Sequence, residues 1–390
     1  MIWTYLHTFE IILWCFMAFS VAYVAFFALI SLFYEKDDIL KQFGARIYSK
    51  KNKFLVLYPA YNEDRVIIHS VEKFLLQDYP PDLYRVVVIS DHMRPETNEY
   101  LTKLPITLLT PTFEKSSKAK AMQYAMEQVE EKFDFVVVMD ADNVVRSEFL
   151  QQLNVLCSTY EAIQCHRCAK NAENDVAVLD GVSEEINNTI FRKAHNRLGL
   201  SSALIGSGMC FSYDLFKKNV FQLTTAGEDR EMEALLLRQN VFIKYAADIH
   251  VFDEKVSNAD NFQKQRMRWM TAQVQSLLHQ LPKIPNAMIH GNINFVDKTI
   301  QQALIPRSIL IVMLIAISTL MTLTVPTWAA KWWVLFGVLV VSLLITIPAP
   351  LRLRSLGKVF TISGLVLRML QNLLHIDHKN TDFIHTEHGK

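Results

Sequence analysis

One short stretch constrains the fold of this chain more than any other, namely Phe135-Val136-Val137-Val138-Met139-Asp140-Ala141-Asp142. Its apolar, mostly β-branched run predicts a strand buried on both faces of a parallel sheet, and such sheets bind ligands beyond the carboxyl ends of their strands. In extended geometry Asp140 and Asp142 project to one side, where their hard oxygen ligands suit Mg²⁺ or Mn²⁺. A strand that ends in an ordinary Asp-Asn turn explains the same residues. The metal interpretation therefore depends on the rest of the chain.

Three long stretches without charged residues predict helices that cross a membrane. The first lies between Glu10 and Glu35, the second from Arg307 to Lys331, and the third from Trp332 to Leu351. Each is long enough to span a bilayer as a helix. The first lacks a basic region before it and a small-residue cleavage site after it, which argues against a secretory signal.

We expect the second and third spans to form a hairpin with Trp328, Trp332 and Trp333 at its turn, because tryptophan favours membrane interfaces. Residues 1–10 carry no lysine or arginine. Basic residues follow the first span and flank the hairpin: Lys36, Lys41, Arg46, Lys50, Lys51, Lys53, Arg307, Arg352, Arg354 and Lys358. The positive-inside rule then predicts a multi-pass protein of the cell (inner) membrane, with its middle region and tail in the cytosol.

Composition argues against a nucleic-acid partner, a disulfide framework and a cysteine zinc site. The net charge of +1 over 390 residues provides no basic excess to neutralise a nucleic acid. The five cysteines suggest no disulfide framework, as in a reducing cytosol. Cys165 and Cys168 have no second pair to complete a zinc site, so we interpret them as core thiols.

These patterns divide the chain into six predicted parts. They are an N-terminal transmembrane helix (1–34), a basic connector (35–52), a cytosolic catalytic domain (53–280), an interfacial segment (281–306), a transmembrane hairpin (307–351) and a cytosolic tail (352–390).

Within the middle region, apolar runs that predict strands alternate with segments of helical spacing. Strands are predicted at 54–58, 84–89, 135–138 and 162–168, and helices at 64–76, 121–130 and 180–196. This alternation predicts a doubly wound α/β sheet. No strand is followed by a Gly-x-Gly-x-x-Gly or Walker-type loop, so a classical dinucleotide or P-loop site is unsupported.

Five motifs occur in the order seen in family 2 glycosyltransferases of the GT-A fold, which the chain resembles over roughly residues 54–275. They are Pro59-Ala60-Tyr61-Asn62-Glu63, Ser90-Asp91, Asp140-Ala141-Asp142, Gly227-Glu228-Asp229 and Gln265-Arg266-Met267-Arg268-Trp269. The last resembles the Gln-x-x-Arg-Trp signature of cellulose, chitin and hyaluronan synthases. The joint occurrence is far more specific than any one motif.

The resemblance implies a role for each motif. Donor binding would fall to Pro59, Ala60, Tyr61, Glu63, Asp91, Lys118, Asp140 and Arg268, and metal binding to Asp140 and Asp142. Asp229 would be the catalytic base. Acceptor binding is assigned to Gly206, Ser207, Gly208, Glu228, Gln265 and Trp269, although the glycines also suit a plain tight turn. Ser90 and Gly227 replace the family's usual Asp and Thr.

The chemistry agrees with these residue types. A carboxylate such as Asp229 can deprotonate a hydroxyl as it attacks an anomeric carbon. A metal ion and Arg268 would neutralise the leaving diphosphate, and Trp269 offers a flat face for a sugar ring. Arg268 and Trp269 also suit a helix anchored at the membrane surface. Near the C-terminus, Phe383, Thr386 and His388 resemble a cellulose synthase gating loop, and we expect Thr386 and His388 to close over the diphosphate once the donor is bound.

The sequence thus predicts a membrane-anchored, metal-dependent, inverting glycosyltransferase. We expect it to move sugar from a nucleoside diphosphate sugar, with UDP favoured, to a saccharide or lipid-linked saccharide in bacterial surface polysaccharide synthesis. Two alternatives stay open. The first is a processive polysaccharide synthase, which would need an oligomeric pore or assembly partners to conduct the polymer. The second is a catalytically inactive membrane subunit that binds sugar nucleotides.

Overall fold

The computed structural model describes residues 2–33, 50–170, 175–225, 227–255, 259–349 and 351–352. Its centre is a mixed eight-stranded sheet in the order β3-β2-β1-β4-β7-β6-β8-β5. The strands β3, β2, β1 and β4 run parallel, and β7 is antiparallel to both β4 and β6. The predicted α/β fold is confirmed, and the sheet is mixed.

The strands are β1 (Phe54–Tyr61), β2 (Tyr84–Asp91), β3 (Thr107–Leu109), β4 (Phe135–Val138), β5 (Val144–Val145), β6 (Ala162–Ala169), β7 (Met209–Ser212) and β8 (Ile243–Asp253). The helices before the last strand are α1 (Ile2–Leu32), α3 (Ile67–Phe74), α4 (Pro95–Leu101), α5 (Lys118–Gln128), α6 (Phe149–Cys157), α7 (Asp175–Asn187), α8 (His195–Arg197), α9 (Tyr213–Val220) and α10 (Glu228–Arg238). Those after it are α11 (Ala259–Gln280), α12 (Ile284–Ile289), α13 (Ile293–Ala303), α14 (Arg307–Thr324) and α15 (Pro326–Thr346).

Alternation along β1 explains why helices cover both faces of the sheet. Phe54, Val56 and Tyr58 belong to one core cluster, which includes residues of α3 and α6. Leu55 and Leu57 belong to a second, which includes residues of α5, α9 and α10. Successive side chains of a strand point to opposite faces, so a fully apolar β1 needs a cover on each side.

All three predicted helices have different bounds in the structure, and the helix expected at 64–76 is α3, which is shorter at both ends. The helix expected at 121–130 is α5, which begins at Lys118 because Ser117 caps it by accepting a hydrogen bond from the Lys120 amide. The helix expected at 180–196 is divided into α7, a π-helical turn at Asn188–Ala194, and α8. Such π-turns have no simple sequence signal and are frequent at functional sites.

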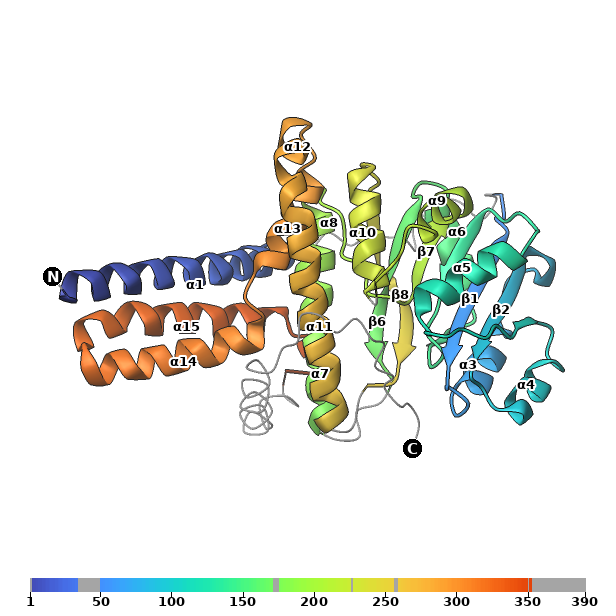
Figure 1. The fold of residues 1–390 in the computed structure, drawn as a ribbon, viewed down its shortest axis with the longest axis horizontal. Coiled ribbons are helices and arrows are strands. Elements are labelled where there is room, and N and C mark those ends of the chain that lie inside the picture. The colour runs from blue at the N-terminus through green and yellow to red at the C-terminus, as the bar shows by residue number, and fades with distance from the viewer. Residues whose placement is uncertain are drawn as a thin grey trace.

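Among the residues that the structure describes, three helices are long and apolar enough to cross a membrane: α1, α14 and α15. They lie together at one end of the molecule, with α7, α11 and α13 between them and the sheet (Figure 1). The hairpin turn is at Val325, so its predicted position at Trp328–Trp333 is wrong. The charge of Lys331 is accommodated within α15 because Glu10 of α1 accepts hydrogen bonds from Lys331 Nζ at 2.7 Å and Trp332 Nε1 at 2.6 Å. Paired charges of this kind are tolerated inside helical bundles.

A buried polar cluster joins α1 to α8 and α13. Tyr23 Oη of α1 lies 2.6 Å from Asp297 Oδ1 of α13 and 2.8 Å from His195 Nε2 of α8. Phe27 of α1 stacks on the fully buried His195 ring with centroids 3.7 Å apart. The first candidate membrane helix is therefore fixed to the domain by specific polar contacts.

We expect Tyr23→Phe to lower the free energy of unfolding by about 1–3 kcal/mol, because it removes the contacts of Tyr23 Oη with Asp297 Oδ1 and His195 Nε2 inside a largely buried cluster. Thermal unfolding in one neutral detergent measures the effect. Tyr5→Phe, whose ring is 69% exposed, is the control. Equal unfolding temperatures for the two variants would show that the cluster does not stabilise the docking of α1.

Candidate functional site

A cavity of about 670 Å³ opens beyond the carboxyl ends of β1, β2 and β4. Most of the residues singled out in the sequence line it: Pro59, Ala60, Tyr61, Glu63, Asp91, Lys118, Asp140, Asp142, Gly206, Glu228, Asp229, Gln265 and Trp269. The ends of β1 and β2, the helices α5, α10 and α11, and three loops supply them. Parallel strands place their carboxyl ends at one edge of the sheet, which is why distant motifs converge there.

Other predicted site residues lie elsewhere or outside the description. Ser207 and Gly208 follow Gly206 but are not among the residues that line the cavity. Arg268 lies on α11 with its side chain outside the described part. Phe383, Thr386 and His388, the residues of the expected gating loop, are outside the described residues.

Lys118 connects three parts of the site. Its Nζ contacts Asp140 Oδ1, donates to the Gly206 carbonyl at 2.7 Å and lies 3.8 Å from Glu228 Oε1. Burial alone would lower the pKa of Lys118, but the carboxylates of Asp140 and Glu228 raise it above its usual value. A permanent positive charge therefore lies among the acidic groups of the cavity.

A further group of acidic residues surrounds Asp142. Its Oδ2 accepts a hydrogen bond from the Glu254 amide at 2.7 Å, and its Oδ1 accepts one from Asn143 Nδ2 at 3.1 Å. Burial and the nearby Asp142 and Asp140 carboxylates raise the pKa of Glu63 to about 9. So many carboxyl groups in one cavity repel one another, and a hard divalent cation is the chemical group that this donor set fits.

Asp229 and Glu228 begin α10, and the backbone of Gly206 approaches them. A Cβ at Gly206 would lie 3.7 Å from Glu228 Oε1 and 3.8 Å from Asp229 Oδ2. Burial, partly offset by Lys118, raises the pKa of Glu228 to about 7. Asp229 Oδ1 accepts a hydrogen bond from the Arg230 amide at 2.8 Å.

Sequence reasoning missed Arg167, which lies in β6 within the same cavity. Its guanidinium lies 3.2 Å from Asp253, 3.4 Å from Glu184 and 4.0 Å from Asp140. Burial disfavours the Glu184 carboxylate, but Arg167 and Arg192 hold the pKa of Glu184 at about 2. The available signal was a charged residue inside a run that predicts a buried strand, a position where charges occur almost only in pairs.

Gly208 shows why the turn before β7 needs glycine. It has a φ of +61°, and a Cβ there would lie 2.8 Å from Val251 Cγ2. Gly199 also has a positive φ, of +73°, but faces open space. We expect Gly208→Ala to destabilise the protein by about 1–3 kcal/mol more than Gly199→Ala, because only the former adds a steric clash to backbone strain. Thermal unfolding of the two variants tests this, and equal losses would contradict it.

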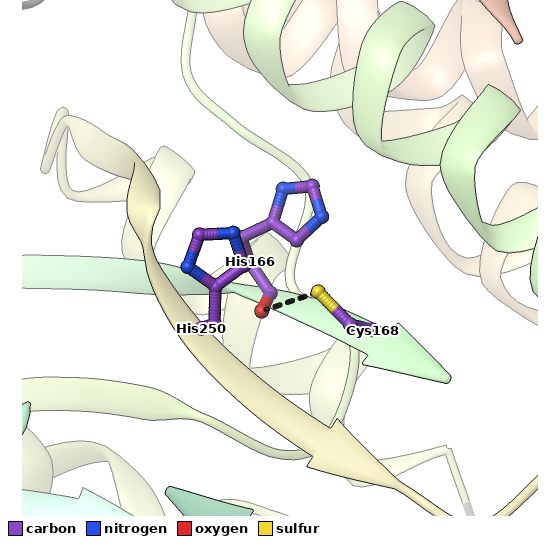
Figure 2. Close-up of side chains that lie close together, drawn as sticks. All are labelled: His166, Cys168 and His250. Carbon is purple, nitrogen blue, oxygen red and sulfur yellow. Dashed lines mark hydrogen bonds between the residues drawn. The ribbon is translucent and has the colours of Figure 1, made fainter. Parts of the chain in front are cut away.

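A separate group of possible metal ligands lies on β6 and β8. His166, Cys168 and His250 offer ligand atoms within 4.8 Å of one another (Figure 2). However, His166 Nδ1 lies 2.6 Å from Tyr245 Oη, and His166 Nε2 lies 3.1 Å from Glu185 Oε1. A metal ion would have to displace one of these partners. Burial raises the pKa of Cys168 to about 12, so its thiol is neutral.

Comparisons with known proteins agree with this geometry. A family model described as Glycosyltransferase like family 2 matches residues 52–272, more than half of the chain. No curated protein matches the sequence.

Among solved structures, the mannosyltransferase PcManGT from Pyrobaculum calidifontis, in complex with GDP-Man and Mn²⁺, gives a TM-score of 0.51 at 15% identity, over 92% of this chain and 99% of that one. S. aureus TarS 1–349 in complex with UDP-GlcNAc gives 0.41 at 16% identity, over 83% of this chain and 92% of that one. At these identities the first likeness shows the fold alone, and the second is too weak for any argument.

Proposed function

From its membership of glycosyltransferase-like family 2, to which this chain belongs, we infer that the protein transfers a sugar from a nucleoside diphosphate sugar to a saccharide or lipid-linked saccharide, with inversion at the anomeric carbon. The chain is a glycosyltransferase of the GT-A fold; the donor, acceptor and stereochemistry are our proposal. The observation that carries it is that Asp229 lines the same cavity as Asp140 and Asp142.

In the proposed reaction, the acceptor hydroxyl oxygen forms a bond to the anomeric carbon of the donor sugar. The bond from that carbon to the diphosphate oxygen breaks, and its electron pair leaves with the nucleoside diphosphate. Asp229 takes the hydroxyl proton as general base. We assign Asp229 as the base and assign none of the other carboxyl groups of the cavity as a nucleophile, so we propose one displacement, and hence inversion.

The leaving diphosphate needs positive charge around it as the bond breaks. A divalent metal ion held by Asp140 and Asp142 would supply Lewis acidity there. Lys118 contacts Asp140 directly, so it is suited to stabilise negative charge at the same place. Trp269 of α11 lines the cavity and offers a face for a sugar ring. We assign Tyr61 and Asp91, at the ends of β1 and β2, to the nucleoside.

We place the catalytic domain on the cytosolic side of a bacterial cell membrane, with synthesis of surface polysaccharide as its setting. The positive-inside pattern supports this orientation. The three candidate membrane helices of the described residues offer little material for a polymer channel in one chain, so we propose the addition of single sugars.

The test is release of nucleoside diphosphate by membranes that contain the protein, over a panel of sugar nucleotides with Mn²⁺ or Mg²⁺, beginning with UDP-sugars. Release from one donor that requires metal and membrane extract as acceptor source would support the proposal and name the donor. Product length would show whether one sugar is added. Metal-dependent donor binding without release or transfer for any donor, with membrane extract present, would favour a binding subunit instead.

A further inference from the structure

The cavity that contains the carboxylates continues into the membrane helices. Its far end is lined by Val24 of α1, Ile311 of α14 and Leu344 of α15. All three helices are candidate membrane spans. A ligand that fills the whole cavity must therefore be polar near Asp229 and apolar between these helices.

Arg307, the first residue of α14, also lines the cavity. Its Nη2 donates to Asn187 Oδ1 at 2.7 Å and to the Ser183 carbonyl at 3.4 Å, both neutral acceptors. Its Nη1 is buried and makes no hydrogen bond among the described residues. Two other arginines of the cavity are paired with carboxylates, Arg266 with Asp180 at 2.7 Å and Arg192 with Glu184 at 3.1 Å.

The start of α14 adds to the positive potential at this point. Pro306 precedes Arg307 and provides no side-chain cap, and both residues line the cavity with Ser308. Uncapped amides at a helix N-terminus favour anions. A buried guanidinium with an unused donor is costly unless an anion binds it, and phosphate matches its geometry well.

We propose that the acceptor saccharide is joined to a lipid through a phosphate group. Arg307 and the first turn of α14 bind that phosphate, the hydrocarbon chain lies against α1, α14 and α15, and the sugar extends past Trp269 towards Asp229. This inference rests on the proposed function for its last clause only, because the phosphate and chain sites can be measured without a donor.

The experiment uses the full chain in a neutral detergent and measures the unfolding temperature with three probes: dodecyl phosphate, dodecanol and inorganic phosphate. We expect dodecyl phosphate to stabilise the protein at much lower concentration than either other probe, because only it has both groups. Arg307→Gln should weaken its apparent affinity about ten- to hundredfold, the usual effect of losing a hydrogen bond to a charged group. Arg238→Gln, at an exposed position on α10, is the control.

A second variant keeps the test informative if Arg307→Gln does not fold. Leu344→Trp fills the apolar end of the cavity and should weaken the apparent affinity for dodecyl phosphate. Nucleoside diphosphate with Mn²⁺ should still stabilise this variant. That stabilisation serves as the folding check for every variant.

Three outcomes would overturn the inference: unchanged affinity in Arg307→Gln, inorganic phosphate binding as tightly as dodecyl phosphate, or competition between dodecyl phosphate and nucleoside diphosphate, which would assign Arg307 to the donor. The outcomes separate the two proposals. Arg307-dependent binding of dodecyl phosphate in a protein that processes no sugar nucleotide would refute only the proposed function. Nucleotide release by the protein, together with equal affinity of Arg307→Gln and the wild type for dodecyl phosphate, would refute only this inference.

Discussion

Replacing Asp229 with asparagine is expected to lower the turnover number about 10²- to 10⁴-fold, the usual contribution of a general base. The change preserves shape and the hydrogen bond that the side chain accepts from the Arg230 amide at 2.8 Å, but removes the proton acceptor. Single-turnover assays with the donor that the nucleotide-release panel identifies, beside measurements of donor affinity, separate a loss of chemistry from a loss of binding.

Two companion variants make this result specific. Glu228→Gln alters the adjacent carboxyl group, whose pKa of about 7 leaves it partly protonated at neutral pH. Its loss of turnover should be smaller than that of Asp229→Asn; the reverse order would make Glu228 the base. Asp214→Asn is a control at the surface, where an exposed side chain pairs with Lys132 at 3.2 Å.

Asp142→Asn is expected to abolish metal-dependent binding of nucleoside diphosphate, with a loss of affinity of about a hundredfold or more. A hard cation prefers charged carboxylate oxygens, and the variant replaces a carboxylate that hydrogen bonds hold in place with a neutral amide. The side chain is only 5% exposed and is held by the Glu254 amide and Asn143, so its orientation does not depend on a ligand. Calorimetric titration of nucleoside diphosphate with Mn²⁺, and again with a chelator, measures the effect.

The chelator should reduce the wild-type affinity to the level of the variant and leave the variant unchanged. Asp214→Asn again serves as the control. If Asp142→Asn retains metal-dependent affinity, Asp142 is not a metal ligand, and Asp140 with the carboxyl groups around Glu63 would be assigned instead.

Local patterns in the sequence were enough to predict the central strand and the acidic residues that follow it. The strand Phe135–Val138 and the carboxylates after it were predictable because burial on both faces demands a continuous apolar run, and because parallel strands place ligand-binding residues at their carboxyl ends. The same logic brought Asp91 and Asp140 to one cavity. A buried strand and a polar strand end are properties of a few consecutive residues, so the sequence displays them directly.

Other features were decided only by tertiary packing. Arg167, Glu184 and Asp253 come from β6, α7 and β8, and no spacing within the chain indicates that they meet. The cluster of Tyr23, His195 and Asp297 depends likewise on how α1 docks against the domain.

The membrane hairpin illustrates the difference most clearly. Counting uncharged residues placed its turn near Lys331, because an isolated charge is costly in a bilayer. In the structure Glu10, more than three hundred positions earlier, pairs with Lys331 at 2.7 Å, and α15 continues through it. The composition of a span is written in the sequence, whereas the free energy of a charge within it depends on the partner that folding places beside it.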